Sequence, residues 1–328
     1  MRTERSIRAV ACVLFVIATL IALAAPASAQ DWPSRNITVI VPLGAGSATD
    51  VMTRVVMDQV GKQLGRTIVV ENRPGAGGTI GANVVAKSAP DGYSALAYGA
   101  LSIANALYTR IPYDTLHDFV PVIGLGQQPL AVVTSATSGY KTLGDLIAAA
   151  KARPGVLNYT SAGIGSASHF GAERLLASAG ISVQHIAFKG APEAITDVVA
   201  GRADFSIQPF TVSLALINDG KLVALAVSAA KRTALKPDVP TTVEAGLPAD
   251  SFYPFWSGLF LPAATPRDIV ERFHAEVAAA LRTPNVRAQL DKLGVEPLDM
   301  NLEQFGKFFR DDVEANLALV KAAHIPRQ

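Results

Sequence analysis

Cysteine is almost absent from the chain, and this absence removes several classes of function. Cys12 is the only cysteine, and it lies in the N-terminal segment described below. A chain with one thiol has no internal disulfide, and a catalytic thiolate or a cysteine-based metal site is excluded once that segment is removed. The 5 histidines show no metal-binding spacing, and no G-x-S-x-G nucleophile elbow occurs. We therefore expect no metal and no cofactor.

An excess of charge of either sign is also missing. The chain has 29 Lys and Arg against 27 Asp and Glu, a formal net charge of +2. The first 29 residues contain three Arg and one Glu, so the remainder carries 26 residues of each sign. A neutral chain has no bulk attraction for nucleic acid or for an anionic membrane, and we expect neither as a partner.

The first 29 residues have the three-part layout of a secretory signal peptide. Arginines provide a basic start, an apolar run extends to Leu23, and an A-x-A cleavage site ends at Ala29. The apolar run is short for a membrane-spanning helix, which needs about 20 residues, and an uncleaved anchor is the alternative. We expect export through the Sec route, removal of residues 1–29, and a mature periplasmic chain that begins at Gln30.

Strand and helix patterns alternate along the rest of the chain. Runs of β-branched residues predict strands, the first at 37–41, and most are followed by apolar residues at helical spacing. This alternation predicts an α/β fold with mostly parallel sheets flanked by helices. About 300 residues after the leader suggest two domains. A glycine-containing stretch at 124–129 predicts a break, and the strand-turn-helix units at 37–60 and 157–179 resemble each other, as two similar halves would.

Two glycine-rich turns, at 44–50 and 161–169, each connect a predicted strand to a predicted helix. Each places glycine and hydroxyl residues at a helix N-terminus, where free backbone N–H groups and the helix dipole favour an anion. In an open α/β sheet such turns lie at the carboxyl edge, where ligands bind. Two of them facing each other across a cleft would hold a carboxylate without any arginine. The alternative is a pair of ordinary tight turns with Ser and Thr caps.

Two other chemistries have weaker support in the sequence. Gly44-x-Gly46 before a helix resembles the start of a dinucleotide fingerprint, but Thr49 replaces the third glycine. Ser166 and His169 could lie one helical turn apart as the dyad of a hydrolase, but no orienting acid is identifiable. A cap or wall residue is therefore the favoured interpretation of His169.

An ordered series of short segments runs through the whole chain after the leader. Its members are Ile40-Val41-Pro42, Gly46-x-x-Thr49-Asp50, 70–78 (VENRPGAGG), 89–93 (APDGY), 112–114 (PYD), 157–159 (LNY), Ser161-x-Gly163-x-Gly165-Ser166-x-x-His169, Lys189-Gly190, 238–241 (DVPT) and 244–246 (EAG). No single segment is specific, but the series in this order is. On these segments the chain resembles the Bug receptors, the substrate-binding proteins of tripartite tricarboxylate transporters.

The resemblance implies a two-lobed periplasmic-binding-protein fold, the Venus flytrap, with a ligand cleft between two α/β lobes. We expect one lobe from residues 30–130 and 251–328 and the other from residues 131–250. Family members hold a ligand carboxylate between the first strand-helix turn and the Ser-x-Gly-x-Gly-Ser turn. Carried onto this chain, the expected ligand-binding positions are Gly46, Ser47, Ala48, Thr49, Asp50, Ser161, Ala162, Gly165, Ser166 and His169.

The chain departs from the family pattern at two places. Leu43 and Ser47 stand in a first turn that often reads Pro-Phe-x-x-Gly-Gly in the family. After the strand expected at 203–207, Gln208 and Phe210 take the place of an acidic and amide pair. We expect both side chains to line the site. The change removes the ionic partner of a ligand ammonium group and favours an aromatic or simple organic acid.

These observations predict a monomeric receptor that captures a small organic carboxylate and delivers it to the membrane subunits of a tripartite tricarboxylate-type transporter. We do not expect an enzyme. Two alternatives stay open. One is an orphan receptor that signals to a sensor system, and the other is a periplasmic serine hydrolase that uses Ser166 and His169.

Overall fold

The computed structural model describes residues 32–249, 251–322 and 325–328. The predicted signal peptide and its cleavage before Gln30 lie outside the described residues. The chain divides into two units, Met1–Ser34 and Arg35–Gln328, and every helix and strand below belongs to the second. Within the described residues, no helix is both long and apolar enough to cross a membrane.

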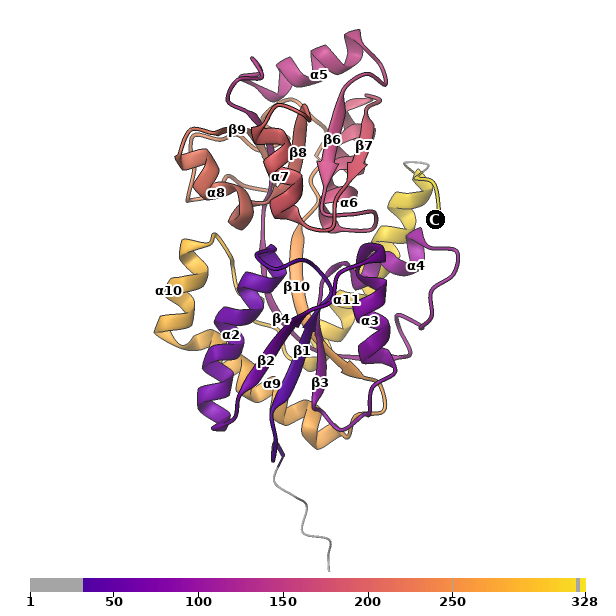
Figure 1. Cartoon of the computed structure of the whole chain (residues 1–328), viewed down its shortest axis with the longest axis vertical. Coiled ribbons are helices and arrows are strands. Elements are labelled where there is room, and N and C mark those ends of the chain that lie inside the picture. Colours follow the sequence, from indigo (N-terminus) through magenta and orange to yellow (C-terminus); the bar gives the residue numbers. More distant parts are fainter. Residues whose placement is uncertain (1–31, 250, 323–324) are drawn as a thin grey trace, which may run out of the picture. The chain divides into compact units, whose positions relative to one another are not determined.

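The first sheet contains 5 strands in the order β2-β1-β3-β10-β4 (Figure 1). Strand β1 is parallel to β2 and β3, whereas β10 is antiparallel to β3 and β4. Helices α2 and α3 both contact β1, which explains why its β-branched run is buried. The strands are β1 (Ile37–Val41), β2 (Ile68–Asn72), β3 (Ser94–Ala97), β4 (Phe119–Gln128) and β10 (Phe255–Pro262).

The second sheet repeats this plan with 5 strands in the order β7-β6-β8-β5-β9. Strand β6 is parallel to β7 and β8, whereas β5 is antiparallel to β8 and β9. The prediction of two similar α/β halves is therefore confirmed. Each sheet is mixed, because β10 in the first sheet and β5 in the second are antiparallel to both of their neighbours. The strands are β5 (Leu130–Ser135), β6 (Asn158–Ser161), β7 (Gln184–Ala187), β8 (Phe205–Pro209) and β9 (Leu222–Ser228).

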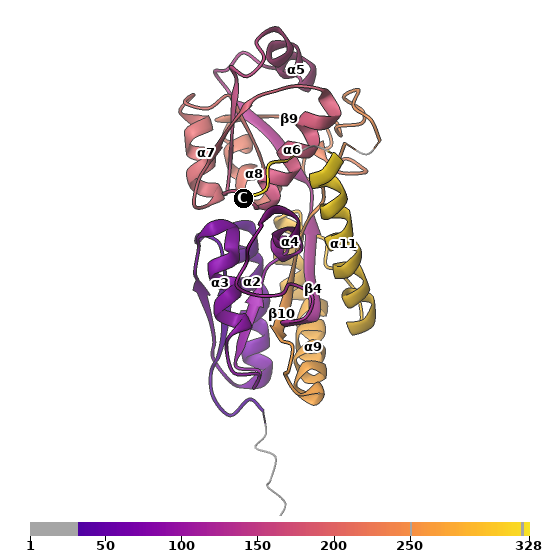
Figure 2. The ribbon, with the colours of Figure 1, turned by 90° about the vertical axis from the view of Figure 1, so that its right-hand side faces the viewer.

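Helices cover both sheets. In the first half α2 packs against α9, and α11 runs alongside β4 (Figure 2). In the second half α6 and α7 both contact β6 and β8. The first half contains α2 (Ala48–Leu64), η1 (Ala76–Gly78), α3 (Thr79–Ala86), η2 (Ala100–Ile103), α4 (Ala104–Leu107), α9 (Arg267–Arg282), α10 (Pro284–Lys292) and α11 (Leu302–Ala322). The second contains α5 (Leu143–Ala152), α6 (Ala167–Ala179), α7 (Ala191–Val199) and α8 (Phe210–Asn218).

The chain passes between the two sheets twice. The first crossing is Pro129, since β4 ends one residue before it and β5 begins one residue after it. The second crossing lies in the segment 229–254, between β9 and β10. Strand β4 thus leads into the first crossing, and strand β10 follows the second, as Figure 1 shows.

The break predicted at 124–129 is confirmed only at Pro129, where the chain crosses to the second sheet, because β4 runs through Gly124 and Gly126 to Gln128. A Cβ at Gly124 would lie 2.7 Å from the Leu298 side chain, and a Cβ at Gly126 would lie 2.6 Å from the Val295 side chain. The glycines therefore let the segment after α10 pack closely on the strand. Gly124 and Gly126 thus mark a close approach within a strand, and the break itself is Pro129.

Each half has an apolar core of its own. In the first half the ring of Trp256 on β10 packs against Phe305 and Phe309 of α11, with ring centroids 6.0 and 6.3 Å apart. In the second half a buried cluster joins β5, β9, α7 and α8 and includes Phe210. These cores hold the two predicted turns at the carboxyl ends of β1 and β6.

Candidate functional site

The first predicted turn joins the end of β1 at Val41 to the start of α2 at Ala48. Ser47 is the N-cap of α2, and its hydroxyl accepts the N–H of Asp50 at 3.4 Å. Gly46 has a φ of +76°, in the left-handed region that favours glycine. The turn is thus built as a capped helix start.

Asp50 fastens this turn to the neighbouring strand. Its carboxylate accepts hydrogen bonds from the Gly46 N–H, the Arg54 Nε and the Asn72 Nδ2, each at 2.9 Å. Burial alone would raise the pKa of Asp50, but hydrogen bonds from Arg54, Gly46 and Asn72 outweigh it and lower the pKa below its ordinary value. Asp50 is therefore an ionised structural anchor whose own hydrogen bonds are satisfied.

The second predicted turn joins β6 to α6 by the same construction. Ser166 is the N-cap, and its hydroxyl accepts the His169 N–H at 3.3 Å and donates to the Gly163 carbonyl at 2.6 Å. The Ser168 hydroxyl accepts the Ala162 N–H at 2.9 Å. Each half thus presents a serine-capped helix N-terminus behind a glycine turn.

Several N–H groups of the two turns have acceptors inside the turns. The pairs include Gly46 with Asp50, Gly163 with Ser161, and Gly165 with the Nδ1 of His169. Helix geometry leaves the first four N–H groups at a helix start without an acceptor in that helix, and Ser47 and Ser166 accept those of Asp50 and His169. The N–H groups of Ala48, Thr49, Ala167 and Ser168 stand at the same helix starts. The paired N–H groups therefore stabilise the turns themselves, as the alternative of capped structural turns expects.

A cavity of about 290 Å³ lies between the two halves. It is lined by Pro42, Leu43, 75–78, Tyr108, 162–164, 187–189 and Gln328. The second predicted turn contributes residues 162–164, whereas the first half contributes Pro42 and Leu43, which come just before the first turn, and no residue of 44–50. Among the predicted ligand positions in the described chain, Ala162 is the one that lines this cavity. The other predicted positions are not part of its lining.

Every lining residue except Ala162 was missing from the predicted ligand positions. The loop 75–78 and Lys189 both occur in the family-like series of segments, so a signal for them existed in the sequence. Tyr108 had no such signal, because it follows the short helix α4 in a stretch without a motif. Its place in the lining depends on how the two halves pack.

A family model described as "Tripartite tricarboxylate transporter family receptor" matches residues 52–325. The chain belongs to this family. It is 35% identical over 285 residues to a protein of Pseudomonas sp. strain P51 named "UPF0065 protein in tcbD-tcbE intergenic region", covering 86% of this chain and 84% of that protein. It is 34% identical over 302 residues to BugT of Bordetella pertussis, covering 91% and 92% of the two chains.

Solved structures of similar proteins have the same fold as this receptor. The periplasmic binding protein BugD superposes with a TM-score of 0.86 at 31% identity, over 90% of this chain and all of that chain (100%). Rpa4515 of R. palustris, solved with adipate, gives 0.87 at 29% identity over 91% and 100%. MatC from Rhodopseudomonas palustris, with bound malate, gives 0.84 at 30% identity over 88% and 100%.

A stack of buried aromatic rings supports the second turn of the receptor. The rings of His169 and His185 are parallel with centroids 4.5 Å apart, and Tyr159 stacks on the other face of His185 at 4.6 Å. The Ser161 Oγ lies 2.6 Å from the His185 Nε2, and the Tyr159 hydroxyl donates to Glu173 at 2.7 Å. Burial, together with the neighbouring His185, lowers the pKa of His169 to about 3, and burial lowers that of His185 to about 4.

This arrangement leaves the hydrolase alternative without its dyad. The Ser166 hydroxyl donates to the Gly163 carbonyl, and His169 reaches Ser166 only through its backbone N–H. Instead, the Nδ1 of His169 accepts a hydrogen bond from the Gly165 N–H, and its Nε2 lies 3.8 Å from the Glu173 Oε1. Among the residues that the structure describes, no group of three or more His, Cys, Asp or Glu side chains could hold a metal ion.

Gln208 and Phe210, which depart from the family pattern and were predicted to line the site, are more buried than expected. Phe210 is fully buried in the core cluster of the second half, so the structure places its ring in that core and not in the wall of the cavity. The reason is that α8 begins at Phe210, and its first residue turns toward β5 and β9. Gln208 is also fully buried, and its Nε2 donates to the Ser206 hydroxyl at 2.9 Å.

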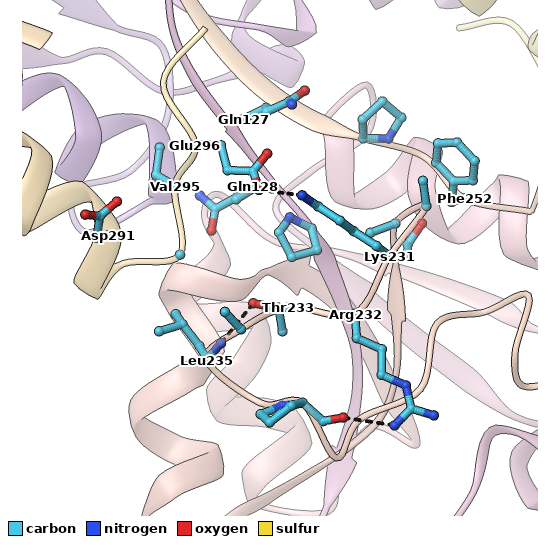
Figure 3. A pocket seen from close by; sticks show the side chains of 18 residues that line it. Gln127, Gln128, Lys231, Arg232, Thr233, Leu235, Phe252, Asp291, Val295 and Glu296 are labelled. Atoms are coloured by element: carbon cyan, nitrogen blue, oxygen red, sulfur yellow. Dashed lines mark hydrogen bonds and ion pairs between the residues drawn. The ribbon is translucent and has the colours of Figure 1, made fainter. Parts of the chain in front are cut away.

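A larger groove of about 720 Å³ lies beside the two crossings of the receptor (Figure 3). It is lined by residues 127–129, 228–235, Pro237, Phe252, Pro254, Asp291 and 294–296. Lys231 of the second half reaches Glu296 of the first, with 3.5 Å between Nζ and Oε1, and both side chains are exposed. Its described lining contains no residue of either glycine turn, so size alone does not identify the ligand site.

Proposed function

We propose that the protein is a solute-binding receptor that captures a small organic carboxylate between its two halves and delivers it to the membrane subunits of a tripartite tricarboxylate-type transporter. The observation that carries the proposal is the cavity of about 290 Å³ lined by Pro42 and Leu43, which lead into the first glycine turn, and by residues 162–164 of the second. The family membership and the neighbours solved with adipate and malate support the ligand class. The larger groove lacks both turns, and we do not assign the ligand to it.

The cavity limits the size of the acid. A volume of about 290 Å³ equals the share of roughly ten liquid waters, at about 30 Å³ each. An acid with about ten non-hydrogen atoms, such as adipate or malate, is of this order. Larger aromatic acids need a wider opening between the halves than this structure shows.

The walls suggest how the acid is held. Apart from Tyr108, Lys189 and Gln328, the lining consists of glycine, alanine, proline, leucine, isoleucine and phenylalanine. The two glycine turns lead into the N-termini of α2 and α6, which present N–H groups and positive dipole ends. We therefore propose a ligand with at least one carboxylate and no obligatory ammonium group, because the lining contains no Asp or Glu to pair with an ammonium group.

The setting of the receptor follows the same proposal. The leader is removed after Ala29, and the mature protein acts in the periplasm as a monomer without catalytic activity. One lobe comprises residues 30–130 and 251–328, the other comprises residues 131–250, and they open and close about the two crossings. The neighbour BugD is named as a periplasmic binding protein, which supports this location.

Binding of an acid and of its amide tests the proposal. Adipate or malate at 100 times its dissociation constant should stabilise the mature protein by about 2.7 kcal/mol in thermal unfolding. The matching diamide should bind far more weakly, because it offers buried N–H donors a poorer acceptor. Calorimetry should show nearly constant affinity between pH 6 and 8, since His169 and His185 stay neutral there, with pKa values of about 3 and 4.

Two results would contradict the proposal. Equal affinity for acid and amide would mean that the carboxylate is not recognised. Steady conversion of the acid to a product would favour the hydrolase alternative. Recovery of the receptor with membrane subunits from cells would separate transport from signalling.

A further inference from the structure

Tyr108 of the first half reaches across the cavity to the second turn. Its hydroxyl donates to the Ile164 carbonyl at 3.0 Å, although the two residues lie in different halves. Its ring also covers Gly165, because a Cβ at that glycine would lie 3.2 Å from the Tyr108 hydroxyl and 3.1 Å from the Leu107 side chain. The end of α4 is thus fitted to the backbone of the second turn.

The Ile164 carbonyl is turned toward the first half by the glycines on either side of it. Gly163 has a φ of +120° and Gly165 has a φ of +82°, both in the region that favours glycine. These two residues allow the chain to fold back so that the carbonyl between them is presented as an acceptor. The acceptor is therefore a built feature of the turn.

The backbone of Gly77 also approaches the Ile164 carbonyl closely. A Cβ at Gly77 would lie 2.1 Å from the Ile164 oxygen and 2.4 Å from the Tyr108 hydroxyl, far inside contact distance. The loop is held from behind, since the Tyr98 hydroxyl donates to the Gly77 carbonyl at 2.6 Å. Any side chain at position 77 would keep the two halves apart.

The backbone of Tyr108 is held by the segment 325–328. The Arg327 Nη2 donates to the Tyr108 carbonyl at 2.9 Å. The Gln328 N–H donates to the Leu107 carbonyl at 2.8 Å, and the Gln328 carbonyl accepts the Thr109 N–H at 2.8 Å. These hydrogen bonds fix the backbone around Tyr108 within the first half, while its hydroxyl contacts the second half.

We propose that Tyr108, Gly77 and Ile164 form a latch that closes the cavity over its ligand and sets the ligand's residence time. The inference rests on the proposed function, because all three residues line the proposed ligand cavity. Because Tyr108 and Ile164 lie in different halves, their hydrogen bond must break before the halves separate and release a ligand. Its loss therefore raises the dissociation rate and changes the association rate little.

Two variants and a matched control test the latch. Tyr108→Phe removes one hydroxyl hydrogen bond and should raise the dissociation rate of bound adipate or malate about fivefold, with an association rate within about twofold of wild type. Gly77→Ala should weaken binding by on the order of 100-fold, because its Cβ cannot coexist with the closed form. Gly65→Ala is the control, since Gly65 has a φ of +60° and nothing within 4 Å of its Cβ position.

Small-angle scattering of the free proteins provides a readout without ligand. Gly77→Ala should have a larger radius of gyration than both wild type and Gly65→Ala, whose dimensions should agree. Equal radii for all three proteins, or an unchanged dissociation rate in Tyr108→Phe, would overturn the latch even if wild type binds acids tightly. If wild type binds no carboxylate, the proposed function fails, and the scattering comparison still decides whether these residues hold the halves together.

Discussion

Acid should destabilise the fold through the buried stack of His169 and His185. In the folded protein the pKa of His169 is about 3 and that of His185 is about 4, against an ordinary value of 6.5. A histidine with a lowered pKa contributes stability that is complete above its unfolded pKa. That stability is lost as the pH falls from about 6.5 toward the folded values, because the unfolded chain takes up protons that the folded chain refuses.

The size of the effect follows from the span between the two pKa values. Within this span, each unit by which the pH falls lowers the free energy of unfolding by about 1.4 kcal/mol per histidine. A fall from pH 6.5 to pH 5 should therefore remove about 2 kcal/mol through His169 alone. His185 adds to this loss, and less than His169 because it is nearer to solvent. Glu173, 3.8 Å from the His169 Nε2, does not cancel the effect, because burial raises the pKa of Glu173 itself.

Urea unfolding of His169→Asn at several pH values measures this contribution. The asparagine oxygen can accept the Gly165 N–H, but it does not titrate in this range. Between pH 7 and pH 5 the variant should lose about 2 kcal/mol less stability than wild type. His117→Asn, at an exposed histidine, is the control for the loss of one imidazole. If His169→Asn and wild type show the same pH slope, the stack does not oppose protonation and the reasoning is refuted.

Three further changes probe the turns and the crossing. Asp50→Ala should cost about 2 to 4 kcal/mol in urea unfolding, because it removes the acceptor of the Gly46 N–H, the Arg54 Nε and the Asn72 Nδ2, and a loss below about 1 kcal/mol would contradict an anchoring role. Ser166→Asp keeps an N-cap acceptor but loses the hydrogen bond that the hydroxyl donates to the Gly163 carbonyl, so the melting temperature should fall. It should also reduce adipate affinity by on the order of 100-fold through like-charge repulsion, and unchanged affinity in the folded variant would place the carboxylate elsewhere. Gly124→Ala should cost about 1 to 3 kcal/mol by crowding Leu298, and adding Leu298→Ala should give a non-additive double variant if the contact is real.

Local patterns predicted the parts of the fold that depend on neighbours in sequence. The strand at 37–41 was predicted in full, because a β-branched run next to a glycine turn is a local signal. The helix starts after Ser47 and Ser166 were also predictable, since hydroxyl residues before an apolar helical pattern are capping signals. The similarity of the two halves was visible for the same reason.

Features that depend on distant residues were missed. Gly124 was interpreted as part of a break because nothing nearby shows that Leu298 packs against it. Phe210 was expected in the ligand wall, but the direction of the first residue of α8 depends on the core that β5 and β9 build. Tyr108 was not predicted at all, because its partner Ile164 belongs to the other half.

The ligand turns show how far residue types alone can lead. Glycines and hydroxyl residues marked the second turn, of which residues 162–164 line the cavity, but the first half contributes Pro42 and Leu43 just before its turn. The sequence could not show that the carboxylate of Asp50 and the ring of His169 accept hydrogen bonds from the N–H groups of Gly46 and Gly165. Fewer turn N–H groups therefore lack an acceptor than the composition of the turns suggested.

The groove of Figure 3 offers a position from which capture of the acid could be read by fluorescence. Lys231 and Glu296 come from different halves, and the Lys231 Nζ lies 3.5 Å from the Glu296 Oε1 in this groove. Neither residue lines the proposed ligand cavity. Because Cys12 precedes the proposed cleavage site, Lys231→Cys gives the mature chain a single thiol that takes a single dye. The surroundings of that dye change whenever the two halves turn about the crossings. The labelled receptor would then serve as a biosensor for its own acid, and its signal would come from the hinge and not from the bound molecule.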